Sequence, residues 1–225
     1  EEIPMEDIRR VIDVNLHGYV HGARAVLPVF RKQGSGVLVN VGSVVSRVTL
    51  PYAAPYVMAK HAVRGLAAVI RQELAADGVK GVRVSTVMPA TIDTPFFEHS
   101  ANYLGRAVRA MPPVYTPERV ARAIVNCARS PRREVFVGNA ARAMVRQHAL
   151  MPGTTERVVA AVAKRCLLFR GRREAPTPGS LYEPFPADDG VHGHWHGRRR
   201  TALRRLGTVG LAVAGVALAR RDSRG

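Results

Sequence analysis

Apolar residues recur at three- and four-residue intervals from residue 5 to residue 32, and this spacing predicts a long helix. Pro28 is expected to kink or tighten its second half. The same periodicity returns over residues 56–77 and ends at a glycine. Two short Val-rich runs, residues 37–41 and 82–87, are instead continuously apolar, which is typical of strands buried on both faces of a parallel sheet.

The alternation continues further along the chain. Thr116-Pro117-Glu118 combines a capping residue, a proline at the first helical position and an acid in the first turn, which predicts a helix to about residue 129. Residues 134–138 form a third short apolar run. Strands that alternate with helices predict an α/β fold, with a parallel sheet between two layers of helices.

The rest of the chain has a different pattern. We predict a helical extension over residues 139–170, a Pro/Gly-rich linker over 171–197 and a basic, apolar tail helix over 198–225. The tail's apolar stretch, 206–219, would measure about 21 Å as a helix against a hydrocarbon core of about 30 Å. A helix packed on the domain or on a partner is therefore favoured, and a membrane-surface anchor flanked by arginines is the alternative.

Composition narrows the function classes only moderately. Hydrophobic residues make up 47%, which is normal for a globular protein, and two cysteines are too few for a disulfide framework, so a cytoplasmic setting is expected. The net charge is +17, but without interleaved aromatic residues it does not favour nucleic-acid binding. Three histidines alternate around Trp195, and an exposed glycine-rich loop is favoured there over a metal site.

Four polar residues form the candidate chemistry. Ser43 directly follows the first predicted strand, Tyr56 begins the next helix and Lys60 lies one helical turn later, while Asn15 lies on the preceding helix. Each alone has an ordinary structural explanation, such as a turn cap or a solvated surface charge. Together they suit proton transfer, because a nearby ammonium lowers the pKa of a phenol and a serine hydroxyl can orient a carbonyl oxygen.

These residues resemble those of the short-chain dehydrogenase/reductases. Asn15-Leu16-His17-Gly18 is similar to the family's Asn-x-x-Gly motif, and Tyr56-Val57-Met58-Ala59-Lys60 to its Tyr-x-x-x-Lys signature. The strand that ends at Ser43 and the segment Pro89–Thr94 also resemble family motifs, over roughly residues 1–138. The resemblance implies a Rossmann-like three-layer sheet, of which this chain would hold the C-terminal part, and an oxidoreductase that uses NAD or NADP.

The resemblance also implies roles for single residues. Tyr56 would be the general acid/base, Lys60 would bind the nicotinamide ribose, Ser43 would orient the carbonyl and Asn15 would support a proton relay. The remaining expected cofactor contacts are Pro89, Ala90, Ile92 and Thr94. The family's lid corresponds to the segment with Phe96, Phe97 and Tyr103, which suggests a hydrophobic hydroxyl or carbonyl substrate. Family members assemble through the helices over 5–32 and 56–77, so a homodimer or homotetramer is expected.

The chain departs from the family pattern at three places. Ala90 replaces the usual glycine, Gly42 stands where a second serine is common, and no glycine-rich phosphate loop precedes the first strand. We therefore expect these 225 residues alone to bind cofactor poorly and to expose a sheet edge. Two alternatives stay open: a truncated, non-catalytic remnant of the family, and a membrane-associated module that uses the basic tail.

Overall fold

The structure is a computed structural model that describes residues 2–166, 168–184 and 190–195. Up to residue 137 helices and strands alternate, and beyond it the described residues add two helices and a strand. The elements are α1 (Met5–Ile12), the π-helical turn η1 (Asp13–His17), α2 (Gly18–Gln33), β1 (Gly36–Val41), the 3-10 turn η2 (Val44–Ser46), α3 (Ala54–Ala76), β2 (Val82–Pro89), α4 (Phe96–His99), β3 (Arg106–Val108), α5 (Pro117–Arg129), β4 (Glu134–Val137), α6 (Asn139–Leu150), α7 (Pro152–Cys166) and β5 (Leu168–Arg173).

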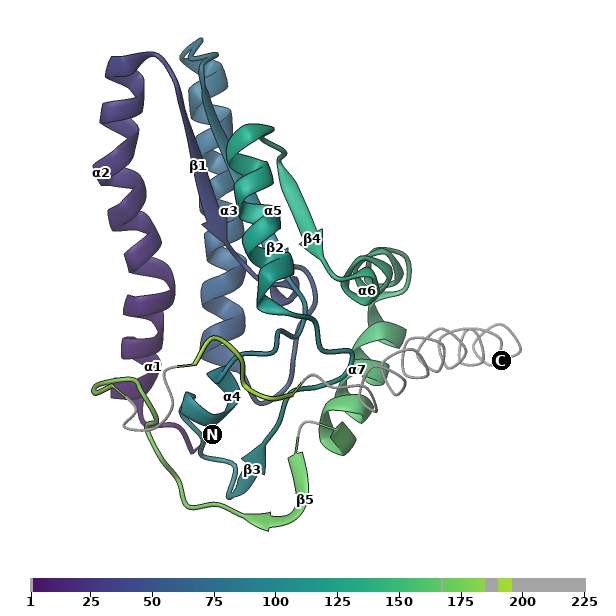
Figure 1. The fold of residues 1–225 in the computed structure, drawn as a ribbon. Coiled ribbons are helices and arrows are strands. Elements are labelled where there is room, and N and C mark those ends of the chain that lie inside the picture. The colour runs from purple at the N-terminus through teal and green to yellow at the C-terminus, as the bar shows by residue number, and fades with distance from the viewer. Residues whose placement is uncertain (1, 167, 185–189, 196–225) are drawn as a thin grey trace.

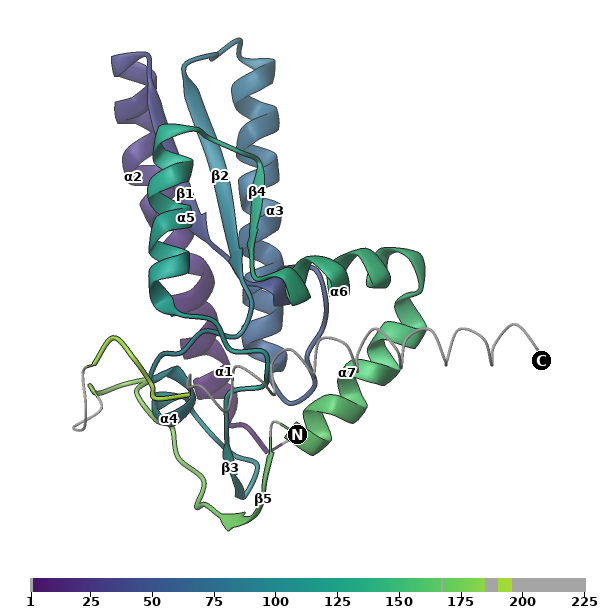
Figure 2. The same cartoon turned by 45° about the vertical axis from the view of Figure 1, so that its right-hand side comes forward.

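The centre of the fold is a parallel sheet in the order β1–β2–β4. Helices α2 and α3 pack against one face, and α5 packs against the other (Figures 1 and 2). Successive side chains of β1 point to opposite faces of the sheet. Leu38 packs against residues of α2 and α3, and Val39 packs against residues of α5. The predicted Rossmann-like three-layer α/β architecture is thereby confirmed.

Strand β1 has one sheet partner in the described part of the chain. It pairs with β2 in parallel register, from Gly36 opposite Val82 to Val41 opposite Val87. Its other edge borders a groove of about 220 Å³ beneath α2. The exposed edge that the sequence predicts is present, and it lies directly beside the candidate site.

Two features differ from the predicted pattern. The helical extension predicted to residue 170 ends at Cys166, because β5 then pairs antiparallel with β3. The helix predicted over 5–32 is interrupted by the π-helical turn at 13–17. The strand β5 pairs with β3, and the π-helical turn packs against α3. Sequence periodicity carries no information on such contacts between distant segments. The predicted tail helix at 198–225 lies outside the described residues; within them, no helix is long and apolar enough to cross a membrane.

Candidate active site

The catalytic serine predicted from the sequence lies where β1 ends. The Ser43 hydroxyl accepts a hydrogen bond from the backbone N–H of Val45 at 3.3 Å, and the Ser46 hydroxyl accepts from the backbone N–H of Ser43 at 3.3 Å. This reciprocal capping begins η2 and fixes the serine at the carboxyl edge of the sheet. Ser43 therefore does cap a turn, and its side chain also acts on Tyr56, whose pKa it lowers.

Tyr56 and Lys60 lie one turn apart on α3, beside that serine. The Lys60 Nζ lies 5.5 Å from the centroid of the Tyr56 ring. The ammonium group is buried and donates to two oxygens, the Tyr19 hydroxyl at 3.2 Å and the Val41 carbonyl at 3.3 Å. Ser43, Tyr56 and Lys60 are thus brought together, as their spacing in the sequence predicts.

Burial dominates the electrostatics of this cluster. It raises the pKa of Tyr56 above its usual value; the hydrogen bond from Ser43 lowers that pKa in part, and Tyr19 raises it further. Burial also lowers the pKa of Lys60 to about 8. The expectation that the lysine lowers the pKa of Tyr56 overall is therefore wrong for this structure. The physical reason is that burial desolvates the phenol, and this outweighs the lowering by Ser43.

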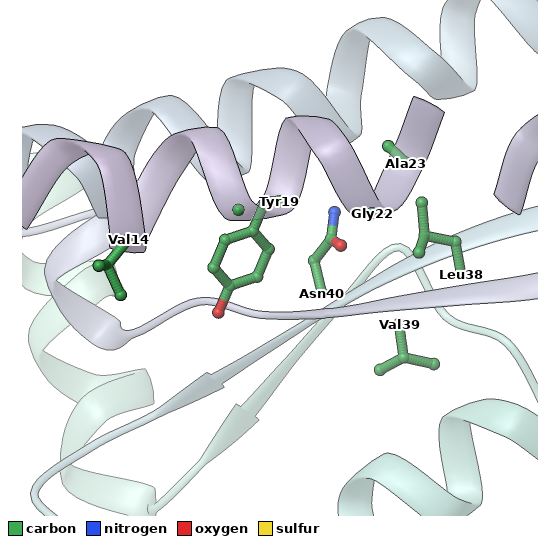
Figure 3. Close-up of a pocket in the computed structure, with 8 residues that line it drawn as sticks. Val14, Tyr19, Gly22, Ala23, Leu38, Val39 and Asn40 are labelled. Atoms are coloured by element: carbon green, nitrogen blue, oxygen red, sulfur yellow. The ribbon is translucent and has the colours of Figure 1, made fainter. Parts of the chain in front are cut away.

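Tyr19 is a part of the site that the sequence analysis did not single out. Its hydroxyl donates to the Val41 carbonyl at 2.6 Å, and Lys60 stands 5.0 Å from its ring centroid. Figure 3 shows the ring directed from α2 toward β1, beside the Asn40 side chain. The Asn40 side-chain nitrogen is buried and has no hydrogen-bond partner among the described residues. A clue was available, because Tyr19 follows Asn15 by one helical turn.

Asn15 lies in the π-helical turn between α1 and α2. That turn packs against α3, the helix that carries Tyr56 and Lys60. A single-turn widening of this kind is frequent at functional sites. Asn15 is thus placed on the element that borders the site, and its role in a proton relay stays a prediction.

The expected nicotinamide segment follows β2 at the same edge of the sheet. Ala90 donates its N–H to the Val137 carbonyl at 3.0 Å, Ile92 bridges to Tyr115, and Thr94 donates to the Ile92 carbonyl at 3.0 Å. Pro89 ends β2, and Ala90 packs into the cluster that contains Val44 and Tyr56. Ligands of open α/β sheets bind outside the carboxyl ends of such strands, so the segment lies where a cofactor would be held.

Aromatic side chains continue the site outward from Tyr56. The Phe96 ring lies 5.7 Å from the Tyr56 ring and 5.4 Å from the Phe97 ring, measured between centroids. Phe96 is 49% exposed, an unusual position for a large apolar side chain beside a buried cluster. Tyr103 is held differently, since its hydroxyl donates to the buried Asp7 carboxylate of α1.

Known proteins are similar to this chain in sequence. A family model described as short chain dehydrogenase matches residues 1–103. The oxidoreductase YxnA of Bacillus subtilis is 35% identical over 162 residues, 70% of this chain and 45% of its own length. Mouse 17-beta-hydroxysteroid dehydrogenase 13 is 30% identical over 132 residues, 59% of this chain and 41% of its own.

A solved structure shows the same fold. A short chain dehydrogenase from Burkholderia cenocepacia, in complex with NADP, superposes with a TM-score of 0.56 and 26% identity, over 69% of this chain and 60% of that one. Over residues 1–103, this chain matches the short-chain dehydrogenase/reductase family. It spans about half the length of the curated relatives that it matches.

Both single-residue departures of this chain from the family pattern have local explanations. A Cβ at Gly42 would lie 3.2 Å from the Ser46 hydroxyl and 3.2 Å from the Thr86 methyl, so a second serine there would be crowded. Ala90 is not among the described residues with positive φ, so its side chain meets no conformational penalty. Neither substitution disturbs the site.

Helix α6 of the extension packs beside the same site. Ala141, Met144 and Val145 of α6 pack into one cluster with Val44 and Tyr56. The extension therefore covers the turn that positions Ser43. In the described part of the chain, no group of three or more His, Cys, Asp or Glu side chains is arranged to hold a metal ion.

Proposed function

We propose that the chain carries the catalytic part of an NAD(P)-dependent oxidoreductase that interconverts a hydroxyl and a carbonyl on a hydrophobic substrate. The observation that carries the proposal is the placement of Ser43 at the end of β1, beside a helix on which the Lys60 ammonium lies 5.5 Å from the Tyr56 ring. The short chain dehydrogenase from Burkholderia cenocepacia is in complex with NADP, which supports a nicotinamide cofactor for this chain. When bound, the nicotinamide would supply or accept the hydride.

The residues present suit the nicotinamide end of such a cofactor. An ammonium group has three N–H donors, and within the described residues two of those of Lys60 bond to Tyr19 and Val41. The third would be available to a ribose hydroxyl. Pro89, Ala90, Ile92 and Thr94 would border the nicotinamide, because they line the carboxyl edge of the sheet beside Ser43. We expect these 225 residues alone to hold the diphosphate poorly, since they lack a glycine-rich strand–turn–helix unit.

The roles of the chain's own groups follow from their contacts. The Tyr56 phenol would give its proton to a carbonyl oxygen during reduction and take it back during oxidation. Its raised pKa keeps the phenol protonated at neutral pH, which suits the reductive direction. Ser43 would hold the substrate oxygen beside that phenol, and Lys60 would stabilise the phenolate left by the transfer. Phe96 and Phe97 would contact the apolar part of the substrate.

Two other functions make different predictions. A non-catalytic remnant would keep the fold and bind no nicotinamide cofactor. A membrane-associated module would depend on residues 198–225, so deleting them would abolish association with anionic vesicles. Neither has a supporting contact within the described residues, whereas the Ser43–Tyr56–Lys60 cluster supports catalysis.

The test is cofactor binding followed by turnover. NADH and NADPH are titrated into the chain and into the longest form that its gene encodes, and carbonyl reduction is then assayed at 340 nm. We expect binding by the longer form and a loss of at least 10³-fold in kcat for Tyr56→Phe. Tyr52→Phe is the matched control, because Tyr52 precedes the same helix and is 51% exposed. No binding by either form would contradict the proposal.

A further inference from the structure

The segment 190–195 lies against the candidate active site, although it is distant in sequence from the residues that form that site. The backbone N–H of Trp195 donates to the buried Asp93 carboxylate at 2.6 Å. The His192 Nε2 lies 3.0 Å from the Glu118 carboxylate, at the start of α5, and its Nδ1 lies 3.9 Å from that of Asp93. Three polar contacts therefore fix this segment between the expected nicotinamide loop and α5.

Close packing fixes the segment as well. A Cβ at Gly193 would lie 2.2 Å from the Thr94 carbonyl oxygen and 2.4 Å from its carbon, so only glycine allows this approach. The atoms it would strike belong to the backbone, which cannot turn aside as a flexible side chain could. The segment thus rests directly on the loop that follows β2.

This anchoring brings Trp195 to the end of the aromatic row. Its ring centroid lies 6.0 Å from that of Phe97, with the rings nearly edge to face. Phe97 contacts Phe96, and Phe96 contacts Tyr56, so three ring contacts lead from the acid/base phenol to the tryptophan. All four rings keep part of their surface exposed. Such a row presents a continuous apolar surface to whatever is bound beside the phenol.

We propose that Trp195 is a specificity-determining residue that forms the outer wall of the substrate site and selects substrates with a bulky, flat apolar group on the carbonyl carbon. This inference rests on the proposed function, and it adds a contact from a part of the chain beyond the family-like region. A small aliphatic ketone would reach only Phe96. An aryl or polycyclic ketone would extend along the row to Trp195.

The test compares two substrates in the full chain that binds cofactor, acetone and an aryl ketone such as 2-acetylnaphthalene. We expect Trp195→Ala to lower kcat/KM for the aryl ketone at least tenfold and to change that for acetone less than twofold, while Trp195→Phe recovers most of the loss. Gly193→Ala should reproduce the selective loss with the tryptophan retained, because the added methyl displaces the segment. Gly153→Ala is its control, since a Cβ there meets nothing within 4 Å.

A second readout is independent of turnover. Trp195 is the single tryptophan of the chain, so intrinsic fluorescence reports from this position alone. The aryl ketone should quench that emission at saturation, and Gly193→Ala should weaken the quenching. An active enzyme whose substrate ratio is unchanged by Trp195→Ala and Gly193→Ala would overturn the inference and leave the proposed function intact. A wild-type protein without turnover of either ketone would count against the proposed function, and unquenched emission would count against the inference.

Discussion

Glu134 is expected to hold the catalytic serine's turn in place. Glu134 is the first residue of β4. Its carboxylate accepts a hydrogen bond at 2.5 Å from Arg47, which directly follows η2, and another at 2.9 Å from Arg64 on α3. The side chain is only 18% exposed, while the arginines are 36% and 32% exposed. Burial opposes ionisation, but the two guanidinium groups outweigh it, so the pKa of Glu134 lies below its usual value.

We predict that Glu134→Gln lowers the free energy of unfolding by about 2 kcal/mol at pH 7. A hydrogen bond to a charged group contributes roughly 1.5–3 kcal/mol, and the substitution removes one of two and weakens the other. The partial exposure of both arginines places the sum near the low end of that range. With a urea m-value of about 2 kcal/mol/M, the unfolding midpoint should fall by about 1 M.

The control is an ion pair of similar length on the surface. Arg31 and Asp77 lie 2.8 Å apart, with side chains 40% and 52% exposed, so Asp77→Asn should change stability by less than about 0.5 kcal/mol.

The pH dependence distinguishes the effect of the charge from that of the side chain's shape. Because the pKa of Glu134 is lower in the folded than in the unfolded state, its charge stabilises the fold above the unfolded pKa of about 4.3. That stabilisation is lost as the pH falls through the folded-state pKa. The difference between wild type and Glu134→Gln should therefore shrink as urea titrations move from pH 7 toward pH 3.5. Equal effects of the two substitutions, or a difference independent of pH, would refute this reasoning.

Three further substitutions test other contacts. Tyr19→Phe removes an acceptor of Lys60, so kcat/KM should fall about tenfold in steady-state assays, in line with ~1.5 kcal/mol for one bond to a charged group. Gly138→Ala should destabilise the fold by about 2 kcal/mol in urea titrations, because φ is +118° and the new Cβ would lie 2.7 Å from the Tyr115 side chain. The control is Gly22→Ala on α2, where a Cβ meets nothing within 4 Å and should stabilise the fold slightly. The Tyr182 hydroxyl donates to the Asp7 carboxylate at 2.6 Å, and this bond raises its pKa to about 12. Asp7→Asn should return that pKa toward its usual value of about 10, as followed by phenolate absorbance.

The pattern and order of residues along the chain were enough to predict the sheet and the centre of the site. The Val-rich runs predicted the strands because a buried parallel strand must be apolar on both faces. The order of Ser43, Tyr56 and Lys60 predicted their proximity because a strand end and the next helix's first turn meet at one edge of the sheet. Contacts between distant segments could not be predicted in this way. The β3–β5 pair and the contact of Trp195 with Phe97 depend on how the chain returns to the site, and periodicity carries no information on that path.

The electrostatics of the site show why residue identity and spacing are insufficient even where they are right. A lysine one turn from a tyrosine predicts a lowered phenol pKa, yet burial raises the pKa of Tyr56. The Lys60 ammonium bonds to Tyr19 and to the Val41 carbonyl, so its donors are directed away from the phenol that it stands beside. The effect of a charge on a neighbour's pKa depends on their separation and on the dielectric between them, and burial of the neighbour can outweigh it. Tyr19 contributes here in two ways, because it accepts a hydrogen bond from Lys60 and raises the pKa of Tyr56. The Tyr19→Phe substitution therefore tests the acid/base arrangement as directly as a change in the pair whose spacing resembles the family signature.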